Sequence, residues 1–462
     1  MLSVLLACTS TPEPAPPSET GGRDSATDSG QQPPLDLIPS WDPADFTTVY
    51  DVGPDQDLAE PGEVPWESLE PGTLVRIHHR EQPYAAKWVV DIAGTEDAPI
   101  VVLGLRSSDG QRPVISGQDA TTRQALDYWS ETRALVKIGG SSSPGQGASW
   151  VWLQGLDLQS AHSSHGFTDD RGQPQTYDDN AAAVFVESGS DLHVVDCALS
   201  DSGNGLFVAS ASSDVQVLAN EIFGNGNVGS AYEHNSYTES ERITFEHNRY
   251  GALREGADGS NLKDRSAGLV IRYNRIEDGN RQLDLVDSSH FADHPEYGDA
   301  WVYGNLLIEG ADQGNSQILH YGGDSGDEAA YRNGRLYFFH NTVHSKRTGN
   351  TTLARLSSAD HYLSATDNIV WAEGNLGILE GEGTVRLDGN WLSEGWVEGF
   401  STVGVLRDED NTTGTDPSLD ADYRPTSAMP DSGAMVSGHT LDWEPTLQAR
   451  ETDEDQGAFE SD

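Results

Sequence analysis

The chain has 462 residues, of which 35% are hydrophobic, 75 are acidic and 27 are lysine or arginine, and its formal net charge is −48. This charge repels phosphate backbones, so we expect no nucleic-acid partner. Only two cysteines, Cys8 and Cys197, are present, which excludes a fold that depends on a disulfide framework.

The chain opens on a short apolar segment that ends in a cysteine. The tetrapeptide LLAC at residues 5–8 resembles the lipobox of bacterial lipoproteins, whose signal peptide is cut before a cysteine that then carries the lipid. The resemblance implies that residues 1–8 are a signal remnant and that Cys8 is lipidated. It also implies an extracellular or cell-surface protein, anchored to the outer membrane of a Gram-negative bacterium.

The segment that follows, residues 9–40, is rich in Pro, Ser, Thr and Gly. This composition predicts a disordered tether, and an ordinary disordered leader without a lipid is the alternative. No later segment is long and apolar enough to span a bilayer.

Residues 41–125 are predicted to form an N-terminal cap and the first coils of a solenoid. Within them, residues 65–75, 94–95 and 99–102 resemble the opening coils of parallel β-helix proteins that act on polysaccharides. Such openings carry a cap over the first rung.

Residues 126–405 contain a repeated row of alternating apolar residues that is followed by a polar ladder position. Asparagine occupies this position in most rows, and cysteine or leucine occupies it in two earlier ones: Asn220, Asn248, Asn274, Asn305, Asn341, Asn368 and Asn390, with Cys197 and Leu156. The alternation indicates strands with one buried face, and a period of roughly 20 to 50 residues indicates a solenoid. The sequence therefore predicts an all-β fold, a right-handed parallel β-helix with an internal asparagine ladder. Cys197 is then a small buried residue.

Residues 406–462 contain the segments 416–419, 422–424 and 455–460, which resemble the closing segment of bacterial secreted β-helix proteins. An irregular C-terminal closing segment is predicted there.

A second strand follows each row, and its alignment predicts a column of polar side chains. The column places His234, Lys263, Asp284 and His320 in consecutive rungs. Stacked strands lie roughly 4.8 Å apart, so the column spans about 15 Å, enough for a short stretch of glycan. Eight lysines and arginines between residues 242 and 281 form a basic island suited to an anionic sugar. The alternative is that they only neutralise neighbouring glutamates.

The segment 234–276 resembles a family of bacterial β-helix proteins and, more distantly, the chondroitinase-B and alginate-lyase group of polysaccharide lyases. In that group a lysine is the Brønsted base, an arginine assists, and a calcium ion neutralises the uronate carboxylate. The resemblance implies that Lys263 is the base, that Arg265 or Arg281 is the neutraliser, and that calcium is a possible cofactor. Glu255 and Asp258 are the candidate calcium ligands.

β-Elimination requires that a base remove the C5 proton of a uronate while a cation neutralises its carboxylate. His234 is the alternative base, and Tyr237, Tyr321 or His320 is the candidate donor to the leaving oxygen. With Lys263 as base, His234 or His320 is expected to assist. The remaining predicted substrate contacts are Tyr237, Arg254, Asp284 and Trp301.

These observations predict an exported monomer that acts on an acidic polysaccharide, in the first instance as a lyase. A noncatalytic glycan-binding or structural surface lipoprotein is one alternative. The other is a glycoside hydrolase in which Asp284 acts with Asp287 or Glu255 as the carboxylate pair.

Overall fold

The computed structural model describes residues 37–140, 147–311, 314–426 and 456–459. Residues 33–462 form one compact unit, and the description below concerns this unit. Cys8 and most of the predicted tether lie outside the described residues. Beside its strands, the described part contains five short 3-10 helices: η1 (Pro43–Asp45), η2 (Pro61–Glu63), η3 (Trp66–Ser68), η4 (Glu131–Arg133) and η5 (Glu328–Ala330). None of the described helices is long and apolar enough to cross a membrane.

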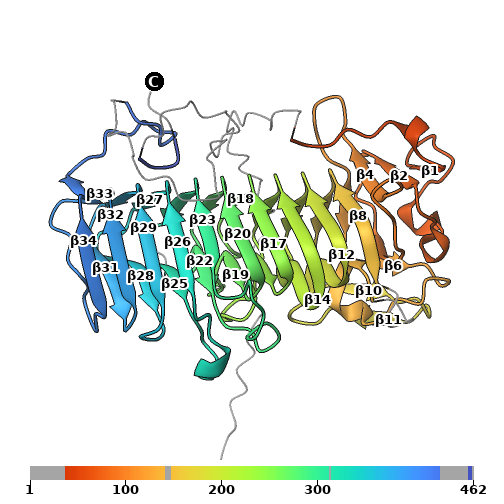
Figure 1. Ribbon diagram of the computed structural model, residues 1–462. Helices are drawn as coiled ribbons and strands as arrows, with labels where there is room; N and C mark the ends of the chain where they lie inside the picture. The colour runs from red at the N-terminus through yellow and green to blue at the C-terminus, as the bar shows by residue number, and fades with distance from the viewer. Residues whose placement is uncertain (1–36, 141–146, 312–313, 427–455, 460–462) are drawn as a thin grey trace, which may run out of the picture. The chain divides into compact units, whose positions relative to one another are not determined.

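The fold is a right-handed parallel β-helix, as predicted. Successive coils add parallel strands to three rows, which we call faces 1, 2 and 3 (Figure 1). Two long strands, β12 (Ala182–Val195) and β14 (Asn204–Leu218), run from face 1 into face 2.

Face 1 also contains β3 (Ala86–Val90), β7 (Ala134–Ile138), β16 (Ser236–Thr238), β19 (Leu262–Asp264), β22 (Leu283–Leu285), β25 (Gln317–Tyr321), β28 (Asn350–Leu356) and β31 (Asn375–Gly381). Face 2 also contains β1 (Thr48–Val52), β2 (Thr73–His78), β4 (Ile100–Leu105), β8 (Ala148–Gln154), β17 (Glu241–Glu246), β20 (Ala267–Arg272), β23 (Ala300–Tyr303), β26 (Arg335–Phe339), β29 (Tyr362–Thr366), β32 (Thr384–Asp388) and β34 (Val405–Glu409).

Face 3 contains β5 (Val114–Ser116), β9 (Asp157–Gln159), β13 (Ala198–Ser200), β15 (Glu221–Phe223), β18 (Arg249–Tyr250), β21 (Arg275–Glu277), β24 (Leu306–Glu309), β27 (Thr342–Ser345), β30 (Ile369–Ala372), β33 (Trp391–Ser393) and β35 (Thr412–Gly414). The short strands β6 (Ala120–Thr122), β10 (Gly166–Thr168) and β11 (Pro174–Thr176) extend face 1 near its N-terminal end.

The core lies inside the coils. It forms because side chains along each strand point inward and outward in alternation. In β20, for example, Leu269 and Ile271 are fully buried, whereas Val270 and Arg272 point outward and are half-buried. Their inward neighbours in adjacent coils are apolar as well, because the parallel register aligns Ile243 with Leu269. Outward positions are thereby free to carry polar residues.

The predicted asparagine ladder is present at the corner between faces 2 and 3. Each amide donates to the carbonyl oxygen of the next, with Asn220 to Asn248 at 3.0 Å and Asn305 to Asn341 at 3.0 Å. Asn411 adds a further rung. Cys197 is fully buried at its ladder position, as predicted, and burial raises the pKa of its thiol to about 12.

The ends of the stack differ in part from the sequence prediction. At the N-terminal end, Trp66 of η3 stacks on Trp88 of β3 with 4.9 Å between ring centroids, within the segment for which a cap is predicted. The stack continues beyond the predicted end at residue 405, because β34 and β35 still pair with the preceding coil. Tyr423 and Phe459 of the closing segment pack against face 3, in a small apolar cluster with Leu306 and Ile308 of β24.

Candidate functional site

Face 1 carries an outward column of polar side chains in its central coils. The register aligns Tyr237, Lys263, Asp284, His320, Arg355 and Glu380 in successive rungs. The prediction that Lys263, Asp284 and His320 share one column is therefore confirmed. The prediction for His234 was wrong, since Tyr237 occupies that rung. The physical reason is that Asn235 bonds to Asn261 in a second internal ladder, so that β16 begins only after this corner.

His234 lies beside the column as a buried, neutral side chain. Its Nδ1 accepts a hydrogen bond from the backbone N–H of Ser260 at 2.9 Å. Burial, together with the charge of Lys263, lowers the pKa of His234 to about 3. Its ring meets the edge of the Tyr237 ring at 5.4 Å, so the histidine supports Tyr237 in the arrangement observed.

Three side chains of the column and its flank form a continuous hydrogen-bonded chain. Asp284 Oδ1 lies 2.9 Å from His320 Nδ1, and His320 Nε2 lies 2.7 Å from Ser357 Oγ. Asp284 and His320 are both 4% exposed, whereas Ser357 is half-buried. An acid, an imidazole and a hydroxyl in this order are the groups of a nucleophilic triad.

The surrounding groups determine the protonation states of Asp284 and His320. Burial opposes ionisation of Asp284, but the hydrogen bond from His320 and the positive charges around it hold the pKa of that carboxyl well below its usual range. Burial also lowers the pKa of His320, although Asp284 opposes the shift. A neutral imidazole beside a carboxylate carries its proton on Nδ1, which leaves the lone pair of Nε2 facing Ser357 Oγ at 2.7 Å.

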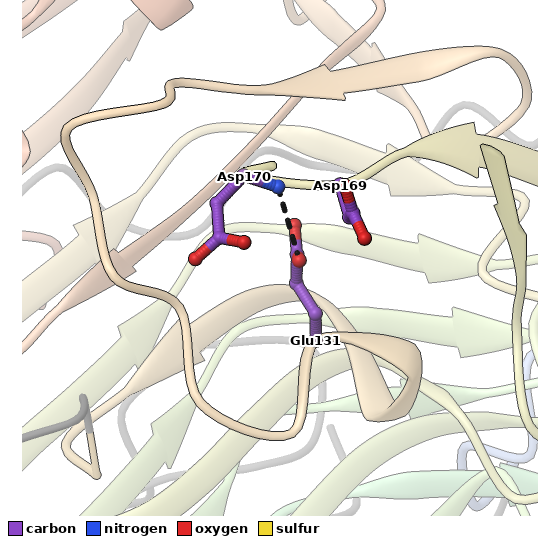
Figure 2. Close-up of side chains that lie close together, drawn as sticks. All are labelled: Glu131, Asp169 and Asp170. Carbon is purple, nitrogen blue, oxygen red and sulfur yellow. Dashed lines mark hydrogen bonds between the residues drawn. The ribbon is translucent and has the colours of Figure 1, made fainter. Parts of the chain in front are cut away.

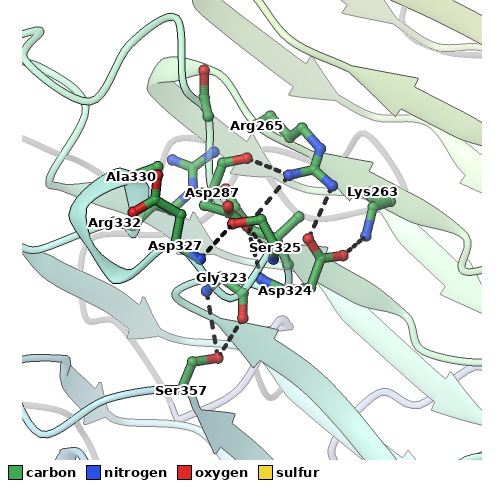
Figure 3. Close-up of polar contacts among 12 residues, drawn as sticks. Lys263, Arg265, Asp287, Gly323, Asp324, Ser325, Asp327, Ala330, Arg332 and Ser357 are labelled. Carbon is green, nitrogen blue, oxygen red and sulfur yellow. Dashed lines mark hydrogen bonds and ion pairs between the residues drawn. The ribbon is translucent and has the colours of Figure 1, made fainter.

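Lys263 is bound by carboxylates on two sides. Its Nζ donates to Asp284 Oδ2 at 2.7 Å and to Asp324 Oδ2 at 2.6 Å, and the side chain is 9% exposed. Arg265 donates to Asp324 Oδ1 at 3.0 Å (Figure 3). It also donates to the hydroxyl of Tyr237 at 3.0 Å. Burial opposes ionisation of Asp324, but Lys263 and Arg265 lower its pKa to about 2. Lys263 is thus a cationic cross-link in this arrangement.

The loop of residues 322–334 covers this part of face 1 and is fastened by a buried ion pair. Arg332 Nη2 lies 2.8 Å from Asp264 Oδ1, and both side chains are fully buried. Arg332 Nε also donates to the carbonyl of Val286 at 2.9 Å. The anchor holds Asp324 over Lys263, and it places the carbonyl oxygen of Gly323 where it accepts a hydrogen bond from the Ser357 hydroxyl at 2.8 Å (Figure 3).

Gly323 is required by this close packing. A Cβ atom at this position would lie 2.1 Å from the ring of Tyr331, a distance at which the two atoms overlap. The glycine also presents its backbone N–H at 3.4 Å from Ser357 Oγ.

Arg281 lies at the margin of the site, and Tyr321 does not belong to it. Arg281 Nη1 is 3.5 Å from Asp284 Oδ1, and its Nε donates to Gln317 at 3.0 Å. Tyr321 is fully buried inside the coil, where its hydroxyl donates to the carbonyl of Gly298. Burial raises the pKa of Tyr321. The phenol therefore faces away from any ligand on face 1.

Two predicted substrate contacts lie elsewhere. Arg254 pairs with Asp201 at 2.9 Å on loops that connect face 3 to face 1. Trp301 lies on face 2, where its ring stacks on Tyr337 with 4.0 Å between centroids.

The predicted calcium ligands lie apart from the cluster of carboxylates found among the described residues. Glu255 and Asp258 are exposed in the loop after β18, and calcium takes six to eight oxygen ligands. In the described part of the chain, three carboxylates lie within 4.8 Å of one another at Glu131, Asp169 and Asp170 (Figure 2). Neither predicted ligand belongs to that group.

Sequence reasoning missed Ser357, Arg355 and Asp324. The predicted column ended at His320 and did not include the next rung, which carries Arg355. The period of two would have shown Ser357, because Arg355 and Ser357 occupy successive outward positions. Asp324 lies on a loop, where side chains do not alternate as they do in a strand, so no sequence pattern indicates its position.

A family model and several solved structures resemble this chain. The family described as "Right handed beta helix region" matches residues 175–355. An alginate lyase from a Paenibacillus species is 12% identical, with a TM-score of 0.46 over 79% of this chain and 99% of that chain. A pectate lyase is 12% identical, with a TM-score of 0.45 over 90% of this chain and 97% of that chain. A rhamnogalacturonan lyase is 11% identical, with a TM-score of 0.39 over 88% and 95%. A comparison with curated proteins finds no match.

Proposed function

We propose that the protein is a hydrolase that removes ester-linked acyl groups from an acidic polysaccharide. The observation that carries the proposal is the chain of two hydrogen bonds, 2.9 Å and 2.7 Å long, that joins Asp284, His320 and Ser357. In this proposal Ser357 is the nucleophile, His320 the general base and Asp284 the group that orients it.

The chemistry follows from the positions of the protons. His320 Nε2 takes the hydroxyl proton as Ser357 Oγ attacks the ester carbonyl, and the imidazolium then protonates the departing sugar oxygen. Water, deprotonated by the same imidazole, cleaves the acyl-serine ester. The products are a free sugar hydroxyl and a carboxylic acid. The Gly323 N–H donates to Oγ over 3.4 Å, and in this proposal it turns to the carbonyl oxygen of the ester when the substrate binds.

The surroundings favour a charged polymer as substrate. Outward side chains continue along face 1 on both sides of His320, at the strand spacing of roughly 4.8 Å. Arg355, in the rung next to His320, is an exposed cation, and Arg281 lies 3.5 Å from Asp284. These cations suit the carboxylates of an extended acidic glycan.

The test is release of acetate from O-acetylated alginate and O-acetylated pectin by the full-length protein. We expect Ser357→Ala to lower the rate at least about 10³-fold. The matched control is Ser358→Ala, a neighbouring half-buried serine, which should stay within about threefold. Loss of activity in both variants, or in neither, would contradict the assignment of Ser357.

β-Elimination is a second candidate, favoured by the position of His320 between cations. A neutral imidazole oriented by Asp284 can remove a C5 proton, while Arg281 or Arg355 neutralises the uronate. His320 takes the place of Lys263 as base in this version, because Lys263 Nζ is bound to two carboxylates.

The unsaturated uronate formed by elimination absorbs in the ultraviolet, which separates the two reactions. Absorbance that grows on polyuronates, that His320→Ala abolishes and that Ser357→Ala preserves would select elimination. The same assay with a chelator tests the predicted need for calcium. Binding of the polysaccharide without either reaction would support the noncatalytic alternative.

A further inference from the structure

Aromatic side chains continue the outward column of face 1 from the candidate site toward the N-terminal end of the stack. The register aligns Phe185 of β12, Phe207 of β14 and Tyr237 of β16 in successive rungs before Lys263. Adjacent rings meet edge to face, with 5.2 Å between centroids in both pairs. Phe207 and Tyr237 are half-buried, so the column is aromatic and partly open over these rungs.

Arg133, the last residue of η4, places its guanidinium over this aromatic column. Its Cζ lies 5.2 Å from the centroid of the Phe185 ring and 5.1 Å from that of the Phe207 ring. Both distances are within the range of about 6 Å over which a cation is attracted to an aromatic ring. The two rings therefore hold the guanidinium at face 1.

The N–H groups of Arg133 have no acceptor in the protein. Its Nε is enclosed without a hydrogen-bond partner. Among the residues that the structure describes, its two terminal nitrogens also form neither a hydrogen bond nor an ion pair, and neither nitrogen is enclosed. The terminal nitrogens are therefore open to a ligand.

The carboxylates that act on Arg133 are bound to other groups. Glu187 is paired with Lys137 at 2.8 Å, and Asp178 accepts a hydrogen bond from the hydroxyl of Thr132 at 2.8 Å. Burial lowers the pKa of Arg133, although both carboxylates oppose the shift. A partly desolvated cation without a bound counter-ion is stabilised when an anion binds to it.

Two arginines of the candidate site differ from Arg133 in this respect. Arg265 lies 3.0 Å from Asp324, and Arg281 lies 3.5 Å from Asp284. An anionic ligand at either of them competes with a carboxylate of the protein. At Arg133 the ligand meets no such competitor.

We propose that Arg133 and the two rings beneath it form a distal subsite that binds a carboxylate of the acidic polysaccharide. The inference rests on the proposed function for its class of substrate, but not for the reaction. A guanidinium can bind a carboxylate through two parallel hydrogen bonds. Phe207 is four rungs from His320, which is roughly 19 Å. The subsite thus binds a sugar unit that is remote from the ester at Ser357.

The test measures binding of hexagalacturonate and hexamannuronate by calorimetry. It uses the full-length Ser357→Ala variant, which lacks the proposed nucleophile. We expect at least one of the two ligands to bind, and the further change Arg133→Met to weaken that binding at least tenfold. Arg171→Met is the matched control, since it removes the same charge from a side chain that is 83% exposed, and it should leave the affinity unchanged.

A second substitution separates the charge of Arg133 from its packing. Methionine keeps an unbranched apolar side chain over the rings, and Arg133→Lys keeps the positive charge. We expect Arg133→Lys to bind the oligouronide more tightly than Arg133→Met, with the circular dichroism of both variants preserved. Equal affinities of these two variants would overturn the proposal.

Binding and acetate release can fail independently of each other. If Arg133→Met weakens binding while the parent releases no acetate, the hydrolytic function is wrong and the subsite is supported. If acetate is released but Arg133→Met binds as tightly as the parent, the subsite is wrong and hydrolysis is supported. The subsite is also wrong if neither oligouronide binds before Arg133 is changed.

Discussion

The buried carboxylate of Asp284 is surrounded by three basic side chains. Lys263 lies 2.7 Å away, His320 lies 2.9 Å away and Arg281 lies 3.5 Å away. Such a cluster holds the carboxyl ionised despite burial. The ionised carboxylate in turn fixes the tautomer of His320 that leaves Nε2 free to accept the proton of Ser357.

This arrangement predicts the pH dependence of hydrolysis. The base must be neutral, and burial lowers the pKa of His320 below its usual 6.5. Activity should therefore be constant above pH 6.5 and fall only at lower pH, as the imidazole becomes protonated. A pH–rate profile of acetate release checks this. An acid limb centred above pH 6.5 would contradict it.

The orienting role of Asp284 can be tested separately. We expect Asp284→Asn to lower the rate of acetate release by about 10³ to 10⁴-fold, because an amide no longer selects the reactive tautomer of His320. Asp327→Asn, an exposed carboxylate on the neighbouring loop, is the control and should keep the parental rate. A small effect of Asp284→Asn would remove Asp284 from the mechanism.

The buried carboxyl of Glu309 makes the free energy of unfolding depend on pH. It is fully buried on β24, and Gln282 donates to it at 2.6 Å. Burial raises the pKa of Glu309 from 4.5 to about 8. The protonated carboxyl is favoured in the folded state, so its contribution to stability is complete below pH 4.5 and is lost as the pH rises through about 8.

Glu309→Gln should remove this pH dependence, because a neutral amide still accepts from Gln282. We expect the variant to match the parent near pH 5 and to exceed its free energy of unfolding at pH 9 by about 2–4 kcal/mol. Urea unfolding at both pH values measures the difference. The exposed Glu255→Gln is the control, and an equal effect of Glu309→Gln at both pH values would contradict the prediction.

At the scale of elements, the loop 322–334 depends on one buried ion pair. Arg332→Met would leave the carboxylate of Asp264 buried without its partner, and breaking a buried pair in this way costs about 3–5 kcal/mol. We expect that loss in urea unfolding, together with faster proteolytic cleavage within the loop. Arg171→Met, at a side chain that is 83% exposed, should change neither readout.

The double variant Arg332→Met with Asp264→Asn tests the cause of that loss. If the unpaired charge is responsible, its removal should restore part of the stability. A double variant that is less stable than Arg332→Met alone would show that the hydrogen bonds of Asp264 to Thr238 and Ser266 matter more than its charge.

The sequence predicted the strands and the ladder, but not the loop, for a physical reason. The row that contains Asn305 repeats because every coil must form the same hydrogen bonds at the corner and bury the same apolar face. The pattern is therefore periodic in the sequence. The pair of Asp264 and Arg332 joins residues 68 positions apart and repeats nowhere. The register error at His234 has a similar origin, since Asn235 belongs to a corner whose ladder the sequence pattern did not show.

At the scale of the molecule, the solenoid places two different chemical surfaces on adjoining faces. Lys263 of face 1 and Val270 of face 2 are a few residues apart on consecutive strands, β19 and β20. The coils fix the distance between successive rungs. The outward side chains give each rung its chemical character.

The net charge of −48 is a property of the whole chain and predicts a salt effect on stability. Folding brings the excess carboxylates closer together, and their repulsion destabilises the compact state. Screening becomes effective as the Debye length falls from about 10 Å at 0.1 M salt to about 3 Å at 1 M. Buried pairs such as Arg332 with Asp264 are screened much less than the exposed surface.

We therefore expect the melting temperature to rise by several degrees when sodium chloride is increased from low to high concentration. Choline chloride at the same ionic strength is the control for specific sodium binding and should give the same rise. A melting temperature that stays constant or falls would mean that exposed ion pairs, such as Arg386 with Glu409 at 2.8 Å, outweigh the repulsion among the unpaired carboxylates. Differential scanning calorimetry at fixed pH decides between these outcomes.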